Sequence, residues 1–363
     1  MLAAGGTAGH IEPALALADA VCRLRPDATV SVLGTPRGLE SRLVPARGYP
    51  LLTIPAAPLP RRIDARLLTL APRLAAAYRG AGRALRRTRA DVLVGFGSYA
   101  ALPAYLAARR ADIPIVIHEQ NPLPGLANRV GARLTRHVYT AVGGTGLPHA
   151  RATGIPLRRS ITTLDRPAVR EQARAFFGLA AQRPTVLVTG GSQGARSLNM
   201  AAAGAAERLS AAGFGMLHVT GSAAAGLPEG NQVDRVAGVV RVPYVDRMDL
   251  AYAAADLIVA RSGSITCAEV SAVGLPAILV PLPHGNGEQA LNAAPLVAAG
   301  AALLVPDADL SADRLAELVG GLLGEPDRLA AMAAAGPGAG HADADERLAR
   351  EVLRIAGDRG AGR

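Results

Sequence analysis

Short apolar runs alternate with longer, Ala-rich segments along the whole chain. The runs have the length of buried strands, and most are followed by a Gly or Pro turn and then by a segment with helical character. The predicted strands are 29–33, 91–94, 113–117, 185–189, 215–220, 239–242, 256–260 and 277–280. Because strands that alternate with helices form βαβ units, this order predicts an α/β fold with parallel sheets.

Two glycine-rich turns open the two halves of the chain. Residues 4–10 read Ala-Gly-Gly-Thr-Ala-Gly-His, and residues 189–195 read Thr-Gly-Gly-Ser-Gln-Gly-Ala. Each turn follows an apolar strand and precedes a helix, and the natural boundary between the halves lies at residues 154–158. The duplication predicts two Rossmann-like domains that face each other across a cleft, with ligands bound at the carboxyl ends of the strands.

The composition is that of a globular protein, with 50% apolar and 19% charged residues. Seven Tyr, four Phe and no Trp leave few platforms for stacking bases, so we expect no nucleic-acid partner. Two distant cysteines, Cys22 and Cys267, argue against a disulfide framework or a zinc site and fit a reducing compartment. We expect neither a signal peptide nor a membrane span, because a glycine turn comes at once and the uncharged stretches are interrupted.

Charge is distributed unevenly. The net charge is +10, and every basic residue other than His is Arg. Residues 1–158 hold 21 Arg against 8 acidic residues, whereas residues 159–363 hold 18 Arg against 21. This asymmetry predicts that the N-terminal half meets an anionic partner.

The densest basic segment is 61–89, with nine Arg and one acid. Its apolar residues lie at helical spacing: Leu67, Leu70, Leu74, Tyr78 and Leu85. Pro72 is expected to kink or restart this helix. A solvated amphipathic helix would explain the pattern. The charge excess favours instead a surface that rests on anionic lipid, with Arg62, Arg66 and Arg73 beside the apolar stripe.

The first glycine turn ends at a titratable group, His10. We expect it at the start of a helix, because Pro13 suits a first helical turn. The helix dipole keeps such a histidine close to neutral, and a neutral ring is able to accept a proton from a substrate hydroxyl. A helix cap is an equally good interpretation. The turns offer N–H groups to an anion, although neither has a dinucleotide or P-loop fingerprint and each alone fits an ordinary βα turn.

Polar residues follow three further strands. In His-Glu-Gln-Asn at 118–121, Asn121 is the better candidate for a sugar hydroxyl, and hydrogen bonding within the fold explains the first two residues. Residues 256–269 predict a strand, a Ser-Gly turn suited to a diphosphate, and a helix in which Glu269 can accept hydrogen bonds from a ribose diol. The loop 284–289 suits sugar hydroxyls or is a plain surface loop. The Asp pairs at 307/309 and 343/345 are interpreted as structural, so no metal site is predicted.

Together these segments resemble the MurG family of bacterial glycosyltransferases over essentially the whole chain. The matching segments are 5–13 (GGTAGHIEP), 96–99 (FGSY), 118–121 (HEQN), 124–129 (PGLANR), 190–196 (GGSQGAR), 261–264 (RSGS) up to Glu269, and 274–276 (GLP). The resemblance implies a GT-B fold. In that fold domain 1–158 takes the lipid acceptor, domain 159–341 holds the UDP-sugar, and a closing helix in 342–363 packs back on the first domain.

The implied reaction is an inverting, metal-independent transfer of N-acetylglucosamine from UDP-N-acetylglucosamine to the muramyl 4-hydroxyl of undecaprenyl-diphospho-N-acetylmuramyl-pentapeptide (lipid I). It forms lipid II for peptidoglycan synthesis and needs no cofactor. The resemblance also implies a peripheral protein on the cytoplasmic face of the bacterial cell membrane, with an anionic membrane surface and the cell-wall synthesis machinery as partners.

The family's residues are carried over position by position. His10 is the implied base, and donor contacts are implied at Thr7, Ala8, Gly9, Asn121, Arg158, Ser192, Val245, Ser264, Ile265, Thr266, Glu269 and Gln289. Val245 would meet uracil through its backbone, Glu269 the ribose, Ser192 and the turn at Ser264 the diphosphate, and Asn121 and Gln289 the sugar. Tyr99, Arg62, Arg66, Leu67, Leu70, Arg73 and Leu74 are implied on the acceptor and membrane side.

Four positions depart from the family pattern. The first strand holds only residues 1–4, about half the usual length, so added apolar residues before Met1 are expected to raise the melting temperature. Ile155, Ser98 and Glu288 replace an Asn, a Gly and a Gln. Two alternatives stay open: another GT-B transferase with a different nucleotide sugar and a lipid or natural-product acceptor, and an inactive UDP-sugar-binding protein.

Overall fold

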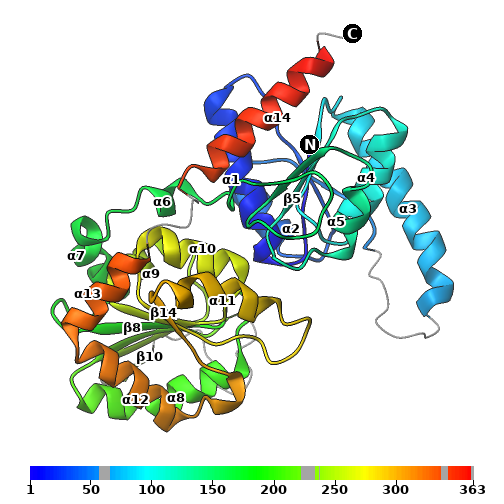
Figure 1. Cartoon of the computed structure of the whole chain (residues 1–363). Helices are drawn as coiled ribbons and strands as arrows, with labels where there is room; N and C mark the ends of the chain where they lie inside the picture. Colours follow the sequence, from blue (N-terminus) through cyan, green and yellow to red (C-terminus); the bar gives the residue numbers. More distant parts are fainter. Residues whose placement is uncertain (57–65, 222–233, 237, 337–341, 361–363) are drawn as a thin grey trace. The chain divides into compact units, whose positions relative to one another are not determined.

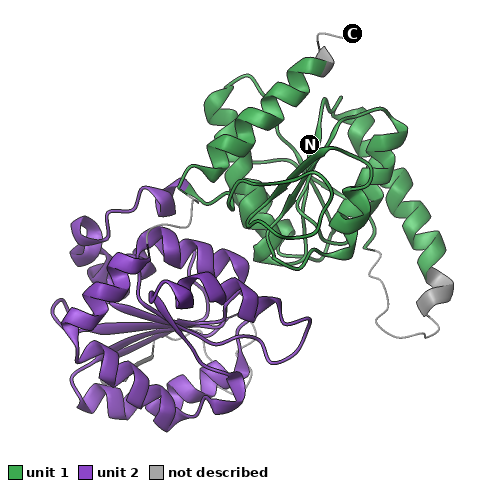
Figure 2. Ribbon diagram, in the orientation of Figure 1, with its two compact units in different colours: residues 1–158, 340–363 green, residues 159–339 purple. Residues whose placement is uncertain are grey.

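The structure is a computed structural model of the chain, and it describes residues 1–56, 66–221, 234–236, 238–336 and 342–360. The chain forms two compact units (Figure 2). Unit 1 comprises residues 1–158 and 340–363, and unit 2 comprises residues 159–339. Each unit is built on one sheet of seven strands (Figure 1).

All strands of the unit 1 sheet are parallel, in the order β3-β2-β1-β4-β5-β6-β7. They are β1 (Leu2–Ala3), β2 (Val32–Gly34), β3 (Leu51–Thr53), β4 (Leu93–Gly95), β5 (Ile115–Glu119), β6 (His137–Thr140) and β7 (Ala150–Ala152). The strand order reverses between the neighbours β1 and β4. Their carboxyl ends therefore form the topological switch point, where ligands bind in Rossmann-like sheets.

Helices cover both faces of this sheet, as parallel strands require. One layer holds α1 (Ala8–Leu24), α2 (Glu40–Ala46) and α14 (Ala344–Gly360), and the other holds α3 (Arg66–Arg87), α4 (Ala101–Arg110) and α5 (Leu126–Gly131). Successive residues of β1 enter the two cores: Leu2 lies in the core of α1 and α14, and Ala3 in the core of α3 and α4. Although α14 ends the chain, it packs against α1 and belongs to unit 1.

The unit 2 sheet has the order β10-β11-β9-β8-β12-β13-β14, with β10 antiparallel to β11 and the other pairs parallel. Its strands are β8 (Thr185–Thr189), β9 (Gly215–Val219), β10 (Asp234–Val236), β11 (Val239–Val242), β12 (Leu257–Ala260), β13 (Ala277–Leu279) and β14 (Ala302–Leu304). β8 and β12 hold the places that β1 and β4 hold in unit 1. Their carboxyl ends form a second switch point.

The helices of unit 2 again lie on both faces of the sheet. They are α6 (Arg159–Thr162), α7 (Arg166–Phe177), α8 (Arg196–Ala211), α9 (Met248–Ala254), α10 (Ser264–Val273), α11 (Glu288–Ala298), α12 (Ala312–Leu323) and α13 (Pro326–Ala335). α8 and α12 share one core, whereas α7 packs against α9 and α10 packs against α11. In the described part of the chain, no helix combines the length and the apolar character that crossing a bilayer needs.

Each of the eight predicted strands occurs, and the α/β class with two Rossmann-like sheets is confirmed. β2, β4 and β5 begin later than predicted, at Val32, Leu93 and Ile115. β3, β6, β7, β10 and β14 are further strands that the sequence analysis did not predict.

The expectation that Pro13 lies in a first helical turn is wrong, because α1 begins at Ala8 and Pro13 lies in its second turn. Pro72 was expected to kink or restart its helix. It does not restart it, because one helix runs from Arg66 to Arg87. Tertiary packing of these helices outweighs the one backbone hydrogen bond that each proline removes.

Candidate active site

The loop after β1 brings His10 to the switch point of unit 1. Gly6 has φ of 87°, a conformation that glycine adopts at little cost, and Thr7 is the N-cap of α1. The half-buried His10 follows in the first turn, with Nδ1 3.3 Å from the Thr7 hydroxyl oxygen. A Cβ on Gly97, in the loop after β4, would lie 3.4 Å from His10 Nε2. The two loops of the switch point therefore meet at this imidazole.

A buried carboxylate, Glu40, holds the first loop in place. Its Oε2 accepts a hydrogen bond from the Gly6 N–H (2.9 Å), and its Oε1 accepts from the N–H and hydroxyl of Thr35 (2.8 and 2.6 Å). A Cβ would come within 2.7 Å of the Glu40 side chain at three glycines: Gly5, Gly34 and Gly38. Our sequence reasoning missed Glu40, because a single acid near a helix start carries no signal of burial.

The same environment sets the charge of His10. Burial lowers the pKa of His10, and the Glu40 carboxylate acts in the opposite direction. The lowered pKa leaves the ring neutral at pH 7. When Nδ1–H donates to the Thr7 hydroxyl, Nε2 keeps the lone pair that a general base uses.

The residues after β5 are held by buried hydrogen bonds. His118 Nε2 lies 2.9 Å from the carbonyl oxygen of Gly154. The Glu119 carboxylate accepts from the N–H groups of Asn121 and Gly125 (3.0 and 3.1 Å) and from Asn128 Nδ2 (2.9 Å). Burial raises the pKa of Glu119, and these hydrogen bonds oppose the rise. His118 and Glu119 thus shape the turn that carries the half-buried Asn121, as the sequence interpretation had it.

Two further candidate residues of unit 1, Arg158 and Tyr99, have different surroundings. Arg158 Nε is 3.6 Å from Glu12 Oε2, which is also 3.5 Å from Arg47. Tyr99, after β4, is 52% exposed. Arg158 therefore belongs to a small ion-pair cluster beside α1, whereas Tyr99 presents its ring to solvent.

The predicted basic helix is α3. The structure describes its side chains only from Leu70 onward, so only these residues test the prediction. Arg62 lies outside the described residues, as do the side chains of Arg66 and Leu67. Arg73 is exposed, and Leu70 and Leu74 are half-buried. The residues of α3 that enter the core come later in the helix: Ala77, Ala81, Ala84 and Leu85. Leu70 and Leu74 therefore keep apolar surface that the core does not cover.

In unit 2, the loop after β8 is built on close backbone contacts. A Cβ on Gly190 would lie 2.3 Å from the backbone nitrogen of Ala195, and a Cβ on Gly221 would lie 2.2 Å from that of Gly194. Any larger residue at these positions would displace the loop. Ser192 is half-buried in the loop, and α8 begins directly after Ala195.

A second helix begins at the neighbouring strand end. Gly263 is the N-cap of α10, and Ser264, Ile265 and Thr266 form its half-buried first turn. Neither α8 nor α10 has an acidic residue in its first turn. Because β8 and β12 are adjacent, two helix N-termini lie at the same sheet edge, where their N–H groups and dipoles favour a diphosphate.

The side chain of Arg261, between β12 and α10, makes an ion pair and hydrogen bonds to other residues of unit 2. It pairs with Asp307 (Nη1 to Oδ1, 2.6 Å) and donates to the Ser197 hydroxyl (2.9 Å) and the Pro281 carbonyl (3.0 Å). Asp307 also accepts from the Ser197 hydroxyl at 2.6 Å. These contacts agree with a structural role for Asp307. The described residues contain no group of three or more His, Cys, Asp or Glu side chains arranged to hold a metal ion.

Glu269 lies in the second turn of α10 and is only 6% exposed. The Tyr252 hydroxyl, from α9, donates to its Oε2 at 2.7 Å. Tyr252 orients the carboxylate that the sequence assigns to ribose. Our sequence reasoning missed it, because a tyrosine in an Ala-rich helix has the pattern of a core residue.

The remaining donor candidates flank these helices. Val245 is buried just before α9. Gln289, in the first turn of α11, accepts a hydrogen bond at Oε1 from the Leu282 N–H (2.9 Å), which fixes the orientation of its amide. His284 and the neighbouring glycines lie in an exposed loop between β13 and α11.

Two family models cover most of the chain. The glycosyltransferase family 28 N-terminal domain matches residues 1–140, and the C-terminal domain matches residues 185–348. A protein of Saccharopolyspora erythraea named UDP-N-acetylglucosamine–N-acetylmuramyl-(pentapeptide) pyrophosphoryl-undecaprenol N-acetylglucosamine transferase is 56% identical over 361 residues, which are 98% of this chain and 94% of that protein. The chain belongs to the MurG family, within glycosyltransferase family 28.

Further relatives agree with this assignment. A protein of the same name from Thermobifida fusca is 56% identical over 356 residues, again 98% of this chain and 94% of that protein. The crystal structure of Acinetobacter baumannii MurG matches 98% of this chain and 99% of that one, with a TM-score of 0.72 and 29% identity. The fold class, GT-B with two Rossmann-like domains, is therefore confirmed.

One of the positions at which the resemblance implies a departure has an unusual backbone. Ser98 has φ of 77°. Residues other than glycine rarely adopt this left-handed region. The position therefore has a backbone conformation that favours glycine, the residue that the resemblance implies there.

Proposed function

We propose that this protein transfers N-acetylglucosamine from UDP-N-acetylglucosamine to the muramyl 4-hydroxyl of undecaprenyl-linked lipid I, which gives lipid II for peptidoglycan synthesis. The observation that carries the proposal is 56% identity over 98% of the chain to relatives named for this transfer. The two switch points support it, because each presents the type of group that the reaction needs.

Unit 2 supplies the donor side. The N-termini of α8 and α10 bind the diphosphate through Ser192 and the turn at Ser264, Ile265 and Thr266. Glu269, held by Tyr252, accepts the ribose hydroxyls. Val245 meets the uracil, and Gln289 meets the sugar. As the sugar leaves, the two helix N-termini stabilise the negative charge on the diphosphate, so the reaction needs no metal ion.

Unit 1 supplies the base. His10 Nε2 takes the proton of the muramyl 4-hydroxyl while that oxygen forms a bond to the anomeric carbon of N-acetylglucosamine. The bond from this carbon to the diphosphate oxygen breaks on the opposite face, so UDP leaves and the configuration inverts. Thr7, Ala8 and Gly9 shape the loop that carries the base, and Asn121 and Arg158 complete the polar side of this unit.

The same unit carries the membrane-facing surface. Large apolar side chains are exposed on α4, α5 and the loops before them: Tyr99, Leu106, Leu123 and Leu126. Arginines on or just after the same helices are exposed too, including Arg109, Arg129 and Arg133. Apolar side chains that enter the headgroup layer and cations that meet anionic lipid suit peripheral binding on the cytoplasmic face of the membrane.

The test is transfer of labelled sugar from UDP-N-acetylglucosamine to a soluble lipid I analogue in the presence of EDTA. The wild type is expected to turn over, and His10→Ala is expected to lose at least about a hundredfold in kcat, the usual contribution of a general base. His10→Ala must still bind UDP, which shows that the variant is folded.

Two results would redirect the proposal. Donor binding without turnover on lipid I analogues would favour a different acceptor or an inactive UDP-sugar-binding protein. Activity that EDTA abolishes and added metal restores would contradict the metal-free step.

A further inference from the structure

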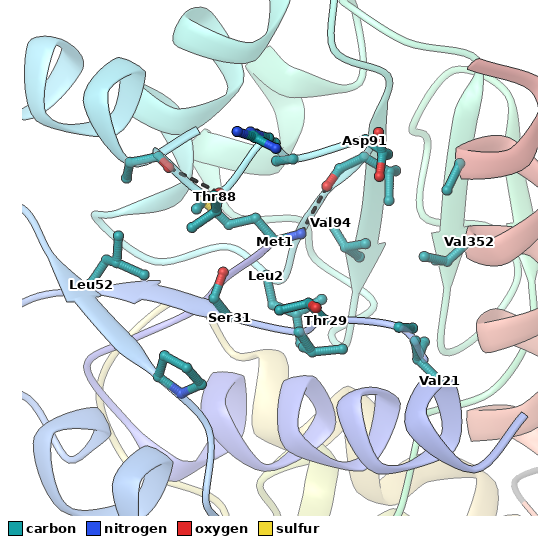
Figure 3. Close-up of a pocket in the computed structure, with 18 of the residues that line it drawn as sticks. Met1, Leu2, Val21, Thr29, Ser31, Leu52, Thr88, Asp91, Val94 and Val352 are labelled. Atoms are coloured by element: carbon teal, nitrogen blue, oxygen red, sulfur yellow. Dashed lines mark hydrogen bonds between the residues drawn. The ribbon is translucent and has the colours of Figure 1, made fainter. Parts of the chain in front are cut away.

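The two ends of the strands in a parallel sheet differ in what they bind. At the amino ends of β1, β2 and β4, unit 1 has a groove of about 1410 Å³ around Met1, whose amino group donates to the Val92 carbonyl at 2.9 Å (Figure 3). Ligands of Rossmann-like sheets bind at the opposite, carboxyl ends. Polar side chains buried at a carboxyl end are therefore in a position to shape a ligand site.

Unit 2 has such a buried polar cluster at the carboxyl end of β9. It consists of His218 in β9, Asn199 in α8 and Thr220 directly after β9, each at most 3% exposed. His218 Nε2 lies 3.0 Å from Asn199 Oδ1, and Asn199 Nδ2 donates to the Thr220 carbonyl at 3.0 Å. One side-chain amide therefore joins a strand, a helix and the segment that follows the strand.

The direction of these hydrogen bonds fixes the form of the His218 ring. Burial lowers the pKa of His218 to about 4, and the neighbouring Arg241 on β11 acts in the same direction. The ring is therefore neutral at pH 7 and carries one proton. Because the Asn199 amide nitrogen donates to Thr220, its oxygen faces the ring, so the proton is on Nε2 and His218 is the donor.

The other ring nitrogen shows what the histidine contributes. His218 Nδ1 is buried and has no hydrogen-bond partner among the described residues. A buried polar atom without a partner costs free energy. An apolar side chain would avoid this cost, and the neighbouring positions of β9 are buried and apolar: Met216, Leu217 and Val219. The hydrogen bond to Asn199 is therefore the contact that an apolar residue here would lack.

Both ends of the cluster lead to the glycine loop after β8. Asn199 lies at the end of the first turn of α8, which begins directly after this loop. Thr220 is followed by Gly221, where a Cβ would lie 2.2 Å from the backbone nitrogen of Gly194 in the loop. The cluster therefore ties the start of α8 to the backbone that packs against the loop.

We propose that His218 is a positioning residue for the donor diphosphate, which acts by orienting the Asn199 amide and so holding the glycine loop and the start of α8 in the binding conformation. The inference deepens the proposed function and rests on its assignment of the diphosphate to this loop. A loop that is already ordered does not lose conformational freedom when UDP binds. A loop that is competent only part of the time lowers the apparent affinity by that fraction.

Three variants of the full chain test the proposal. His218→Leu removes the donor, whereas His218→Gln offers a side-chain N–H in place of Nε2–H. Met216→Ala is the matched control, because Met216 lies on the same face of β9, is buried in the core that α8 lines, and makes no hydrogen bond to the cluster. Calorimetric titration measures the affinities for UDP and for uridine, and a thermal scan gives the melting temperature of each protein.

In His218→Leu, the affinity for UDP is expected to fall about tenfold, the effect of one hydrogen bond. The affinity for uridine is expected to stay unchanged, because uridine lacks the diphosphate, and its binding shows that the variant is folded. His218→Gln is expected to keep UDP affinity within about threefold of the wild type. Met216→Ala is expected to lower the melting temperature through its cavity but to keep the ratio of the two affinities.

Three results would overturn the proposal. Equal losses for UDP and uridine in His218→Leu would mean that the whole donor site has loosened. The same selective loss of UDP affinity in Met216→Ala would mean that any damage to this core has the effect. A wild type that binds UDP no more tightly than uridine would remove the diphosphate from the loop. Neither ligand needs an acceptor, so UDP binding without sugar transfer contradicts the proposed function and not the role of His218.

Discussion

At the scale of single residues, the two switch points depend on side chains that hold others in place. Glu40 fixes the backbone of the loop that ends at His10, and Tyr252 fixes the carboxylate of Glu269. The sequence analysis proposed His10 and Glu269 as site residues from their places after a strand and in a helix. It did not identify Glu40 or Tyr252, because their roles arise from contacts between distant segments.

Removing the Tyr252 hydroxyl tests this positioning role. In Tyr252→Phe the buried Glu269 carboxylate loses one hydrogen bond, and it no longer has a fixed orientation toward the ribose. We expect the KM for UDP-N-acetylglucosamine to rise about tenfold, the effect of one hydrogen bond to a charged group, with kcat little changed. Steady-state kinetics at saturating acceptor measure both constants. A fall in kcat with unchanged KM would contradict the assignment of Glu269 to the donor.

Ser98 allows a stability prediction at the same scale. Its φ of 77° strains a side chain that has a Cβ, so Ser98→Gly is expected to stabilise the protein by about 1 kcal/mol. Ser98→Ala is the matched control, because it removes the hydroxyl but keeps the Cβ. The urea midpoint measures both variants. The Ser98 hydroxyl oxygen is buried without a hydrogen-bond partner among the described residues. Equal gains from the two variants would therefore show that this hydroxyl, and not the backbone, is the source of the strain.

At the scale of elements, the sequence predicts well those strands whose own residues form a continuous apolar run. The buried strands β8, β9 and β12 have continuous apolar runs, and their predicted ranges agree with the structure to within a residue or so. The short edge strands β7 and β14 were missed, because their pairing is determined by neighbours and not by their own residues. The predicted starts of β2, β4 and β5 were two or three residues too early, because an apolar run does not show where its ladder of hydrogen bonds begins.

The amino end of β1 gives a pH prediction. The Met1 amino group has a pKa of 8.0 in the unfolded chain and about 6 in the folded protein. The unfolded chain therefore binds more protons between these values, and stability rises from pH 6 to pH 8. The difference is at most about 3 kcal/mol. Unfolding by urea at several pH values measures it.

N-terminal acetylation is the control for this effect. It removes the charge of the amino group but leaves His10 and the other titrating groups unchanged. The acetylated protein is expected to lose this part of the pH dependence. Parallel curves for the two proteins between pH 6 and pH 8 would show that the amino group does not titrate differently in the folded state.

At the scale of the whole molecule, the two sheets share one parallel order, β3-β2-β1-β4-β5-β6 in unit 1 and β11-β9-β8-β12-β13-β14 in unit 2, and each places a glycine turn and a helix N-terminus at its switch point. The copies differ in charge, since the excess of Arg lies in the first half of the chain. They also differ in continuity. Unit 2 is one uninterrupted segment, whereas unit 1 needs residues from both ends of the chain.

This difference predicts unequal effects of shortening the chain. Ending the protein after residue 339 removes α14, whose Leu348, Val352 and Ile355 are buried in the core that α1 also lines. It also removes the partner of Arg23, which pairs with Asp345 at 2.9 Å. We expect unit 1 to lose its protection against proteolysis, while unit 2 keeps its own. Mass spectrometry of a timed digest identifies the surviving fragments.

Leu348→Ala is the milder variant. We expect it to lower the free energy of unfolding by about 3 kcal/mol, with the effect confined to unit 1. Equal protease resistance of the two units in the shortened chain would mean that α14 is an appendage, and that the core of unit 1 is complete without it.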